Sequence, residues 1–494
     1  MISRKYFLCL TIFLVAMSGC VVQRSPISGN KRAYAYSWAQ EIQIGREADP
    51  VIISQYGLYD DPELASYVTR IGQKVLAESH LRRPDSPAEF RQTEFTFRVL
   101  DSPVVNAFAL PGGFIYVTRG LLAHVDSEAQ LAVVLGHEVG HVAGRHASQR
   151  ALSQQFGQLG LIAGAIAGQE LLGLPGQDIL SLGGSVAQLM FLRYGRDDER
   201  ESDELGVEYS ALANYESEAG AAFFETLKRL SDKSGQSIPS FLSTHPDPGE
   251  REVRIRQLAA EWENRVTMDV LGVDPFMAQI DGIVVGDDPR QGYTENSVFY
   301  HPQLRFQFPV PSGFQLINQP SQVAMFNEKQ TAIMLFALAQ DSESARAAAN
   351  DFAGQEGFVV VERSRSSTGV FPAEVVIVDV ATQDGQEIRV LARFTEYGGN
   401  IYSFIGYAAK TDFNNHVGDF SNTMQGFSEL RDQEKINVEP TRLKVIRADR
   451  SAPLSAFIPA PLPGDYSDED IAILNQTTLA TPVQNGAPVK LIAK

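Results

Sequence analysis

The sequence has few cysteines, no excess of basic residues and no long apolar run. Only Cys9 and Cys20 occur among the 494 residues. Lys and Arg number 42 against 60 Asp and Glu, a formal net charge of -18, which argues against a nucleic-acid partner because phosphate binding needs a basic surface. Residues 157–190 are rich in Gly, Ala, Leu and Ile, but polar residues interrupt them before they reach the length of a membrane span.

The N-terminus has the features of a targeting segment. Basic Arg4 and Lys5 precede an apolar run from Tyr6 to Ala16, which is too short to cross a bilayer as a helix. The following tetrapeptide, residues 17–20, ends in Cys20 and resembles a bacterial lipoprotein signal. We therefore expect a signal peptide over residues 1–20. The alternative is an ordinary signal peptide that contains a cysteine by chance.

If the lipoprotein interpretation holds, Cys20 is lipidated and residues 21–39 form a polar tether. Val21, rather than Asp, follows the cysteine, which favours the outer membrane. The expected location is the periplasm, at the inner leaflet of that membrane. With Cys9 removed and Cys20 lipidated, no disulfide is expected.

The strongest chemical signal is the H-E-x-x-H pattern at residues 137–141. Its segment is predicted to be a helix from Ser127 to Arg145, because Ser127 begins a capping box and apolar residues recur at helical spacing. His137 and His141 then lie one turn apart on one face, where both imidazoles can bind one zinc ion. Glu138 beside them can hold and deprotonate a water molecule.

Two glycines interrupt the same predicted helix. Gly136 and Gly140 are poor helix formers. We interpret them as positions where a neighbouring element packs closely.

A zinc protease also needs a third protein ligand. The metzincin pattern is excluded, because its last position is Ala147 and the nearby His146 is rotated by about 100° around a helix. A thermolysin-like glutamate is excluded, because that neighbourhood is apolar at residues 160–162. The next acidic cluster contains Glu199 and Asp203, which share a helical face and suit a ligand with a supporting carboxylate. The alternative is a solvated, charged helix start.

A predicted hairpin precedes the zinc helix. Residues 106–117 read as two short strands around a Pro-Gly-Gly turn. An exposed edge there can pair with an extended peptide and hold its scissile bond at the metal. The candidate substrate strand is Asn106, Ala107 and Phe108, and the alternative is a core hairpin.

The length of the chain predicts several domains. We expect a mainly helical domain at 40–265, a linker rich in Gly, Asp and Pro at 266–295, and an α+β domain at 296–432 that carries no chemical constellation. A small C-terminal module at 438–494 faintly resembles a LysM-type peptidoglycan-binding module.

Together these motifs resemble the HtpX and CAAX-prenyl-protease zinc metallopeptidases, over about residues 40 to 265. The resemblance is greatest to their soluble periplasmic lipoprotein branch, related to the β-barrel assembly-enhancing protease. No helical period of about 34 residues follows, so the tetratricopeptide repeats of that protease have no counterpart. The matching stretches are His137-Glu138-x-x-His141, Glu199-x-x-x-Asp203, Asn106-Ala107-Phe108 and Ser243-Thr244-His245-Pro246.

The resemblance implies a site. Glu138 is the expected catalytic base, Asp203 supports the site, and His245 either occupies the open position of the zinc or assists catalysis. One zinc ion per chain is held by His137, His141 and Glu199.

The resemblance also implies a function and a fold. The fold class is multidomain, with a mainly α, zincin-like metalloprotease domain containing a small β-sheet, then an α+β domain and a small C-terminal module. The expected activity is zinc-dependent cleavage of extended or misfolded envelope proteins in outer-membrane quality control. Expected partners are misassembled envelope polypeptides, the membrane, and peptidoglycan or the assembly machinery. The alternative is a tethered periplasmic chaperone or cell-wall-associated binding protein with a plugged or vestigial zinc site.

Overall fold

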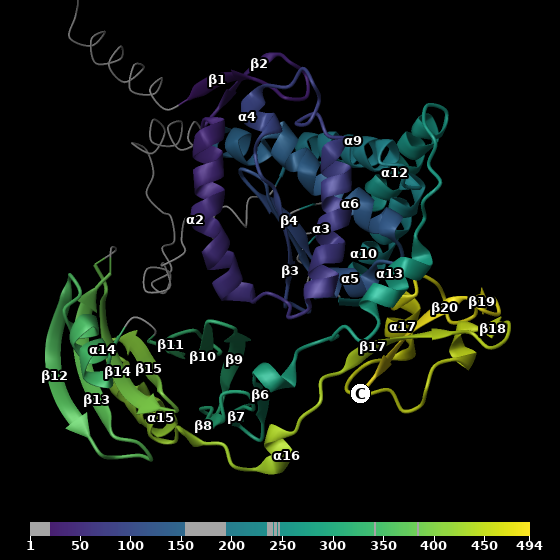
Figure 1. The fold of residues 1–494 in the computed structure, drawn as a ribbon. Helices are drawn as coiled ribbons and strands as arrows, with labels where there is room; N and C mark the ends of the chain where they lie inside the picture. Colours follow the sequence, from purple (N-terminus) through teal and green to yellow (C-terminus); the bar gives the residue numbers. More distant parts are fainter. Residues whose placement is uncertain are drawn as a thin grey trace, which may run out of the picture.

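The computed structural model describes residues 20–153, 194–234, 241, 245, 248–339, 342–382 and 385–494. Most of the expected signal peptide and the segment 157–190 lie outside these ranges. Within them, no helix is long and apolar enough to cross a bilayer. The chain forms a helical part above, a sheet-rich part below it, and a C-terminal group of short elements beside the sheet-rich part (Figure 1).

The helical part is built around a small three-stranded sheet. Its order is β3-β5-β4, with β3 parallel and β4 antiparallel to β5. The predicted hairpin is therefore confirmed, and β4 lies at an edge of the sheet. The elements are α2 (Trp38–Tyr56), α3 (Pro62–Ala77), α4 (Ala88–Arg91), β3 (Thr96–Leu100), β4 (Ala107–Leu110), β5 (Phe114–Thr118), α5 (Arg119–His124), α6 (Glu128–Gly144), α9 (Arg196–Leu212), η3 (Ser217–Ala219), α10 (Gly220–Ser234) and α12 (Pro248–Glu263).

Helix α6 is the predicted zinc helix and forms the centre of this part. The Ser127 hydroxyl accepts a hydrogen bond from the Gln130 N–H at 3.2 Å, so the expected N-cap is confirmed. The helix ends at Arg145, which has a left-handed backbone with φ 57°. Every residue from Ala129 to Gly144 is buried. The helix is therefore enclosed on all sides rather than amphipathic.

The close packing expected at the glycines of α6 is confirmed, and the neighbour is α9. A Cβ atom on Gly136 would lie 2.9 Å from the carbonyl oxygen of Gly206, and one on Gly140 would lie 3.2 Å from the Cα of Ser202. Gly206 makes an equally close approach, because its Cβ would lie 2.9 Å from the backbone nitrogen of His137. Small residues on both helices therefore bring the acidic start of α9 against the histidines of α6.

Residues 21–34 form a hairpin within the segment 21–39 that was expected to be a polar tether. Strand β1 (Val21–Arg24) pairs antiparallel with β2 (Lys31–Tyr34). The hairpin is held at the end of the zinc helix, because Arg145 donates to the Gln23 side chain at 2.7 Å and lies 3.7 Å from the centre of the Tyr34 ring. A buried arginine more than 100 positions away thus orders a segment that has a polar composition.

The expected linker, 266–295, is also ordered. It contains α13 (Val273–Ile280), whose Phe276 and Ile280 are buried in the core of the helical part. Beyond it, Val284 forms an antiparallel bridge with Arg442. The many Gly and Asp residues of this segment suggested an open linker. The few apolar residues that anchor it to the core could not be recognised from composition. The short helix η4 (Pro289–Gln291) follows.

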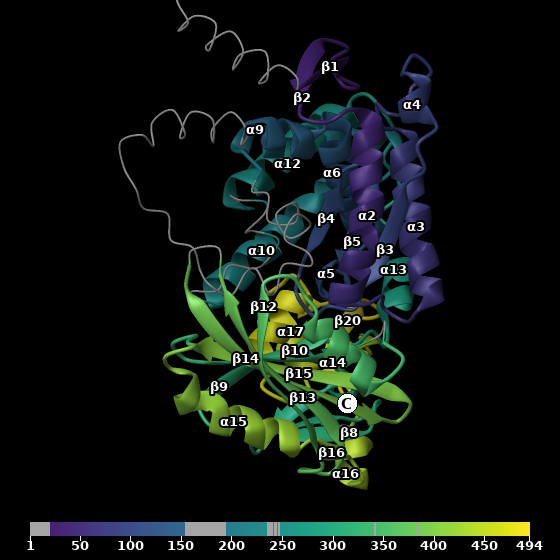
Figure 2. The same ribbon diagram turned by 90° about the vertical axis from the view of Figure 1, so that its left-hand side faces the viewer.

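The sheet-rich part has a seven-stranded antiparallel sheet in the order β12-β13-β14-β15-β11-β10-β9, and a smaller sheet ordered β16-β8-β7-β6. Helices α14 and α15 belong to two separate apolar cores on opposite faces of the large sheet (Figure 2). The elements are β6 (Tyr293–Glu295), β7 (Val298–His301), β8 (Phe306–Pro309), β9 (Phe314–Gln319), β10 (Gln322–Asn327), β11 (Ala332–Leu338), α14 (Ala345–Ala353), β12 (Phe358–Ser366), β13 (Ala373–Ala381), β14 (Glu387–Tyr397), β15 (Asn400–Ala409), α15 (Phe413–Gln425) and β16 (Ser428–Glu429).

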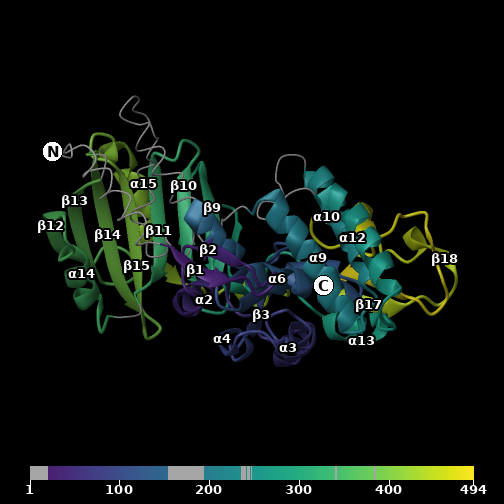
Figure 3. The same cartoon turned by 90° about the horizontal axis from the view of Figure 1, so that it is seen from above.

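The elements from β17 onward lie beside α13 and away from β12 to β15 (Figure 3), whereas the short helix α16 lies against β6, where Lys435 pairs with Glu295. Strands β17 and β20 pair antiparallel. Apolar residues from β17, α17 and β20 belong to the same core as the apolar residues of α6. The elements are α16 (Gln433–Ile436), β17 (Arg442–Arg447), β18 (Ala452–Pro453), η5 (Leu454–Ala456), α17 (Asp468–Leu474), β19 (Pro482–Val483) and β20 (Pro488–Ala493).

Candidate metal centre

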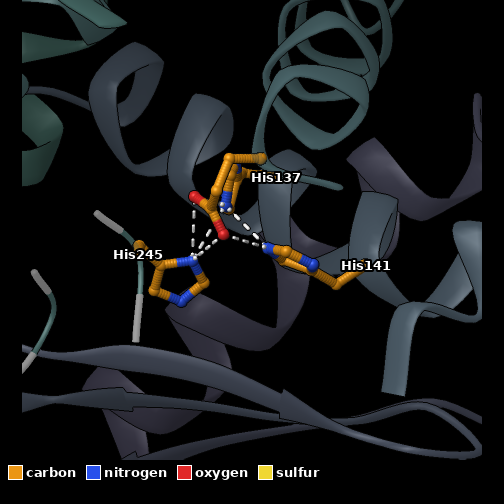
Figure 4. A group of neighbouring side chains, drawn as sticks. His137, His141 and His245 are labelled. Carbon is orange, nitrogen blue, oxygen red and sulfur yellow. Dashed lines mark hydrogen bonds and ion pairs between the residues drawn. The ribbon is translucent and has the colours of Figure 1, made fainter. Parts of the chain in front are cut away.

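Four buried side chains meet between α6 and α9. His137 and His141 come from α6, Glu199 comes from the first turn of α9, and His245 lies just before α12. One nitrogen or oxygen of each lies within 4.8 Å of the others. Figure 4 shows His137, His141 and His245 pointing toward one another. The predicted ligand set is thus brought to a single point.

The geometry of this group fits a tetrahedral zinc ion. Ligand atoms about 2.0–2.1 Å from such an ion lie about 3.3 Å apart. Here the Nε2 atoms of His137 and His141 are 2.9 Å apart, His245 Nδ1 lies 3.3 Å from His137 Nε2, and His141 Nε2 lies 3.5 Å from Glu199 Oε1. Imidazole nitrogens with one carboxylate oxygen are also the donors that zinc prefers.

The protonation states of the group suit metal binding. Burial lowers the pKa of His137 to about 4 and holds that of His141 well below its ordinary value. Burial opposes ionisation of Glu199, but His245 and Arg251 hold the pKa of that carboxyl well below its usual range. Neutral imidazoles and an ionised carboxylate are the forms that bind a metal ion.

Glu138 lies beside the group and makes no hydrogen bond of its own within the described residues. It is fully buried, and neither carboxylate oxygen makes a hydrogen bond to any part of the chain that the structure describes. Burial raises its pKa to about 7, against the opposing effect of His245. An unpartnered buried carboxylate is costly to the fold. Its pKa near neutrality suits a group that accepts and returns a proton.

Each histidine of α6 is held by a second side chain. The Nδ1 atom of His137 lies 3.0 Å from Asp203 Oδ1, and the Nδ1 atom of His141 lies 2.9 Å from His146 Nδ1. His146 in turn lies 2.9 Å from Glu201 Oε2. These contacts leave both Nε2 atoms free to face the metal position. His146, a polar residue that fits no metzincin pattern, therefore supports His141.

Arg251, on α12, is a site residue that sequence reasoning missed. Its guanidinium is buried, with Nη1 3.0 Å from Glu199 Oε2 and Nη2 2.6 Å from Asp203 Oδ1. It thus compensates the charge of two buried carboxylates. An arginine in the first turns of a charged helix predicts solvent exposure, so the sequence carried no signal for this role.

Tyr194, just before α9, was also missed. Its ring stacks on the imidazole of His141, with centroids 3.9 Å apart and planes at 24°. Burial raises the pKa of its hydroxyl. The stacking fixes the plane of the His141 ring. A single tyrosine after a long apolar segment carries no sequence signal of such a contact.

His245 fills the fourth position of the group. It is fully buried, and its Nδ1 atom lies 3.0 Å from Glu199 Oε1. Its Nε2 atom lies 3.7 Å from Glu138 Oε1. Burial lowers the pKa of His245, but the carboxylates of Glu199 and Glu138 outweigh burial and raise it. His245 therefore completes a group of four donor side chains with His137, His141 and Glu199.

The candidate substrate strand lies next to the site. Helix α6 packs against β4, which begins at Ala107. The side-chain oxygen of Asn106 is buried and has no hydrogen-bond partner within the described ranges. Phe108 stacks on Tyr116 in the core, 4.9 Å between ring centres. At the start of this edge, the Phe241 N–H donates to the carbonyl oxygen of Val105 at 3.3 Å.

Cys20, the candidate lipidation residue, lies immediately before β1 with a free thiol.

Comparison with known proteins matches residues 62–260 to the model of Peptidase family M48. A putative beta-barrel assembly-enhancing protease of Vibrio cholerae is 28% identical over 268 residues, 52% of each chain. The beta-barrel assembly-enhancing protease of Escherichia coli K12 is 28% identical over 243 residues, 47% of each chain. Mitochondrial metalloendopeptidase OMA1 of Bos taurus is 34% identical over 174 residues, 34% of this chain and 33% of that one.

The chain thus spans about half or less of the length of these curated relatives. The matched region contains the H-E-x-x-H helix, Glu199, Asp203, His245 and Arg251. Residues 62–260 therefore match a Peptidase family M48 domain, the metallopeptidase family to which this part of the chain is similar.

Proposed function

We propose that the chain is a zinc-dependent endopeptidase of the bacterial cell envelope that cleaves extended or misfolded proteins in outer-membrane protein quality control. The observation that carries the proposal is the convergence of His137, His141 and Glu199 beside Glu138, a buried carboxylate that makes no hydrogen bond within the described residues. The names of the relatives support the envelope role.

The chemistry follows from the donors around the site. One zinc ion held by His137, His141 and Glu199 would polarise a peptide carbonyl and make a water molecule more acidic. Glu138 then takes the proton of the attacking water on its carboxylate and returns it to the nitrogen of the departing amine. Asp203 keeps the Nε2 atom of His137 directed at the metal position.

Substrate is proposed to bind as an extended chain along β4. Among the described strands it is an edge of its sheet and lies against α6, although its four residues are buried rather than exposed as the sequence suggested. An added strand gains main-chain hydrogen bonds regardless of sequence, which suits misfolded polypeptides. The unpartnered oxygen of Asn106 supplies an acceptor at the start of this edge.

The catalytic assignment is tested with Glu138→Gln, beside Glu128→Gln on the same helix as the control. Glu138→Gln should bind zinc as wild type does and lose about a hundredfold or more in the rate of casein cleavage, since it can no longer accept a proton. Undiminished cleavage by this variant would remove Glu138 from the mechanism.

His245 is proposed either to block the metal or to stabilise the oxyanion. Its position, 3.0 Å from Glu199, is compatible with both roles. His245→Ala should raise the rate of casein cleavage if the residue blocks and lower it if the residue assists. An unchanged rate would contradict both roles.

Attachment to the outer membrane through a lipidated Cys20 is part of the proposal. Cys20 lies immediately before the β1–β2 hairpin, which is fixed to the peptidase domain by Arg145. The mass of the mature N-terminal peptide checks this assignment, because an acylated cysteine is heavier than a free thiol.

A second candidate is a tethered periplasmic chaperone or cell-wall-associated binding protein with a plugged zinc site. The complete burial of His245 in the fourth position favours it. This candidate predicts that neither wild type nor His245→Ala cleaves unfolded protein with zinc in excess, and casein turnover by either one excludes it.

A further inference from the structure

The C-terminal residues 441–494 contact the peptidase domain through a buried lysine. Lys490, on β20, has no exposed surface. Its ammonium donates to the carbonyl oxygens of Ala123 at 2.9 Å and Val125 at 3.2 Å, and it pairs with Asp126. Carbonyl groups at the end of a helix lack intrahelical partners. Lys490 therefore satisfies the end of α5 and the turn that leads into α6.

A glutamine pair joins the same two regions. Gln476, just after α17, donates to the carbonyl oxygen of His124 at 2.8 Å, and its amide exchanges hydrogen bonds with that of Gln130 at 2.8 Å. Gln130 also accepts the Asp126 N–H at 2.9 Å. The first turn of the zinc helix is thus bound to residues almost 350 positions away.

The backbone supports the same grouping. Val285 N–H donates to the Thr441 carbonyl at 2.9 Å, and Gly282 N–H donates to the Leu443 carbonyl at 2.8 Å. The chain thus leaves the helical part and returns to it at adjacent positions. Residues 293–430 lie between them with cores of their own.

We propose that residues 441–494 are part of the catalytic domain rather than a separate binding module, and that Lys490 is a positioning residue for the metal helix. The proposal rests on the peptidase function proposed above. Lys490 acts through the α5–α6 turn. His137 lies ten residues beyond Ser127, about 15 Å along a stiff, fully buried helix. A shift at this end of α6 is therefore transmitted to the histidines.

The test uses full-length protein and two readouts, zinc affinity by competition with a chromophoric chelator and the denaturant midpoint of unfolding. Lys490→Met should lower both, because it leaves Asp126 without its partner. We expect zinc affinity to fall about three- to tenfold, less than the ten- to hundredfold seen for groups that contact metal ligands directly. Zinc affinity equal to that of wild type would overturn the positioning role.

A double variant separates positioning from stability. Lys490→Met with Asp126→Asn removes the unpaired charge, so the unfolding midpoint should largely recover. Zinc affinity should stay low, because the carbonyls of Ala123 and Val125 remain without their donor. Recovery of both would show that Lys490 only stabilises the fold. If Lys490→Met does not fold, Gln476→Leu tests the same contact with α6 by the same readouts.

Lys233→Met is the matched control. Lys233 also bridges the C-terminal residues to the helical part, through Asp470 and Ser467, but on the surface and away from α6. It should change zinc affinity less than twofold. A loss as large as that of Lys490→Met would contradict a specific role for the α5–α6 turn.

Hydrogen exchange on the intact chain tests the domain assignment. Amides of β20 and α6 should lose protection at the same denaturant concentration, and amides of β13 to β15 at another. Opening of β20 together with the large sheet, or by itself, would overturn the assignment. If wild type binds no zinc, the proposed function fails; if wild type binds zinc and Lys490→Met binds it equally, only the positioning role fails.

Discussion

Single buried side chains in this protein are tuned by what surrounds them. Asp203 and Arg251 form a buried ion pair behind His137, while Glu138 makes no hydrogen bond in the described part of the chain and lies 3.7 Å from the Nε2 atom of His245. The first arrangement lowers the cost of buried charge, and the second leaves a carboxylate that changes protonation near neutral pH. Of the acids at this site, Asp203 thus supports a histidine, whereas Glu138 is suited to proton transfer.

His80, which lies outside the metal centre, should make the stability of the fold depend on pH. It is buried and contacts the Tyr209 hydroxyl at 2.9 Å, and burial lowers its pKa to about 4. Between pH 6.5 and pH 4 the unfolded chain therefore binds a proton that the folded chain does not. The resulting stability is present above pH 6.5 and is lost as the pH falls to 4, by up to about 3 kcal/mol.

His80→Gln should flatten this part of the pH profile, as measured by urea unfolding of the peptidase domain at pH 7, 5.5 and 4. His416→Gln, in the sheet-rich part, is the control. An identical acid slope in wild type and His80→Gln would refute the assignment.

The sequence predicted some site residues and not others for identifiable reasons. The helical period alone places His137 and His141 together, and the need for a third ligand directs attention to Glu199. Arg251 and Tyr194 could not be predicted, because no local pattern tells which face of α12 meets α9 or which ring covers His141. Those contacts are set by tertiary packing.

At the scale of elements, the site depends on how closely α6 and α9 approach. Gly136, Gly140 and Gly206 make up this contact, and Glu199 lies two turns before Gly206 on α9. The sequence indicated close packing at the two glycines of α6. It could not name α9 as the neighbour, since helix pairing is a long-range property.

Gly206→Ala should force the two helices apart. Its Cβ would meet the His137 nitrogen at 2.9 Å and the Val133 carbonyl oxygen at 3.1 Å, both of them backbone atoms. We expect a loss of about 1–3 kcal/mol of stability together with weaker zinc binding, measured by denaturant unfolding and chelator competition.

Gly418→Ala, in the interior of α15, provides the comparison. A Cβ there meets nothing within 4 Å, so this variant should be stabilised by about 0.4–1 kcal/mol through reduced freedom of the unfolded chain. Equal effects of the two substitutions would mean that the α6–α9 contact is not tight.

The whole molecule has at least two independently packed regions. One core joins α3, α6, α10, α13 and the C-terminal strands, and two further cores fill the sheet-rich part. Composition suggested a small module at 438–494 because its strands and helix look self-sufficient locally. The contacts that bind it to the turn before α6, such as Lys490 with Asp126, join residues 364 positions apart. The local sequence around either residue does not predict them.

Zinc should therefore stabilise only one of these regions. At free zinc a thousandfold above its dissociation constant, the gain is about 4 kcal/mol for the region that holds the ligands. Calorimetry with zinc and with chelator should shift the transition of the peptidase domain and leave that of the sheet-rich part in place. A common shift of both transitions would contradict independent packing.

The hydrogen-bonded neighbours Val285 and Thr441 have a consequence for how such proteins diversify. Because the catalytic domain already holds these two points together, the entropy of closing the intervening chain depends only weakly on its length. The junction is therefore a position at which chain segments of different length can be inserted. The intervening sheet-rich domain could therefore be exchanged for another by engineering without altering the helix that carries the H-E-x-x-H motif.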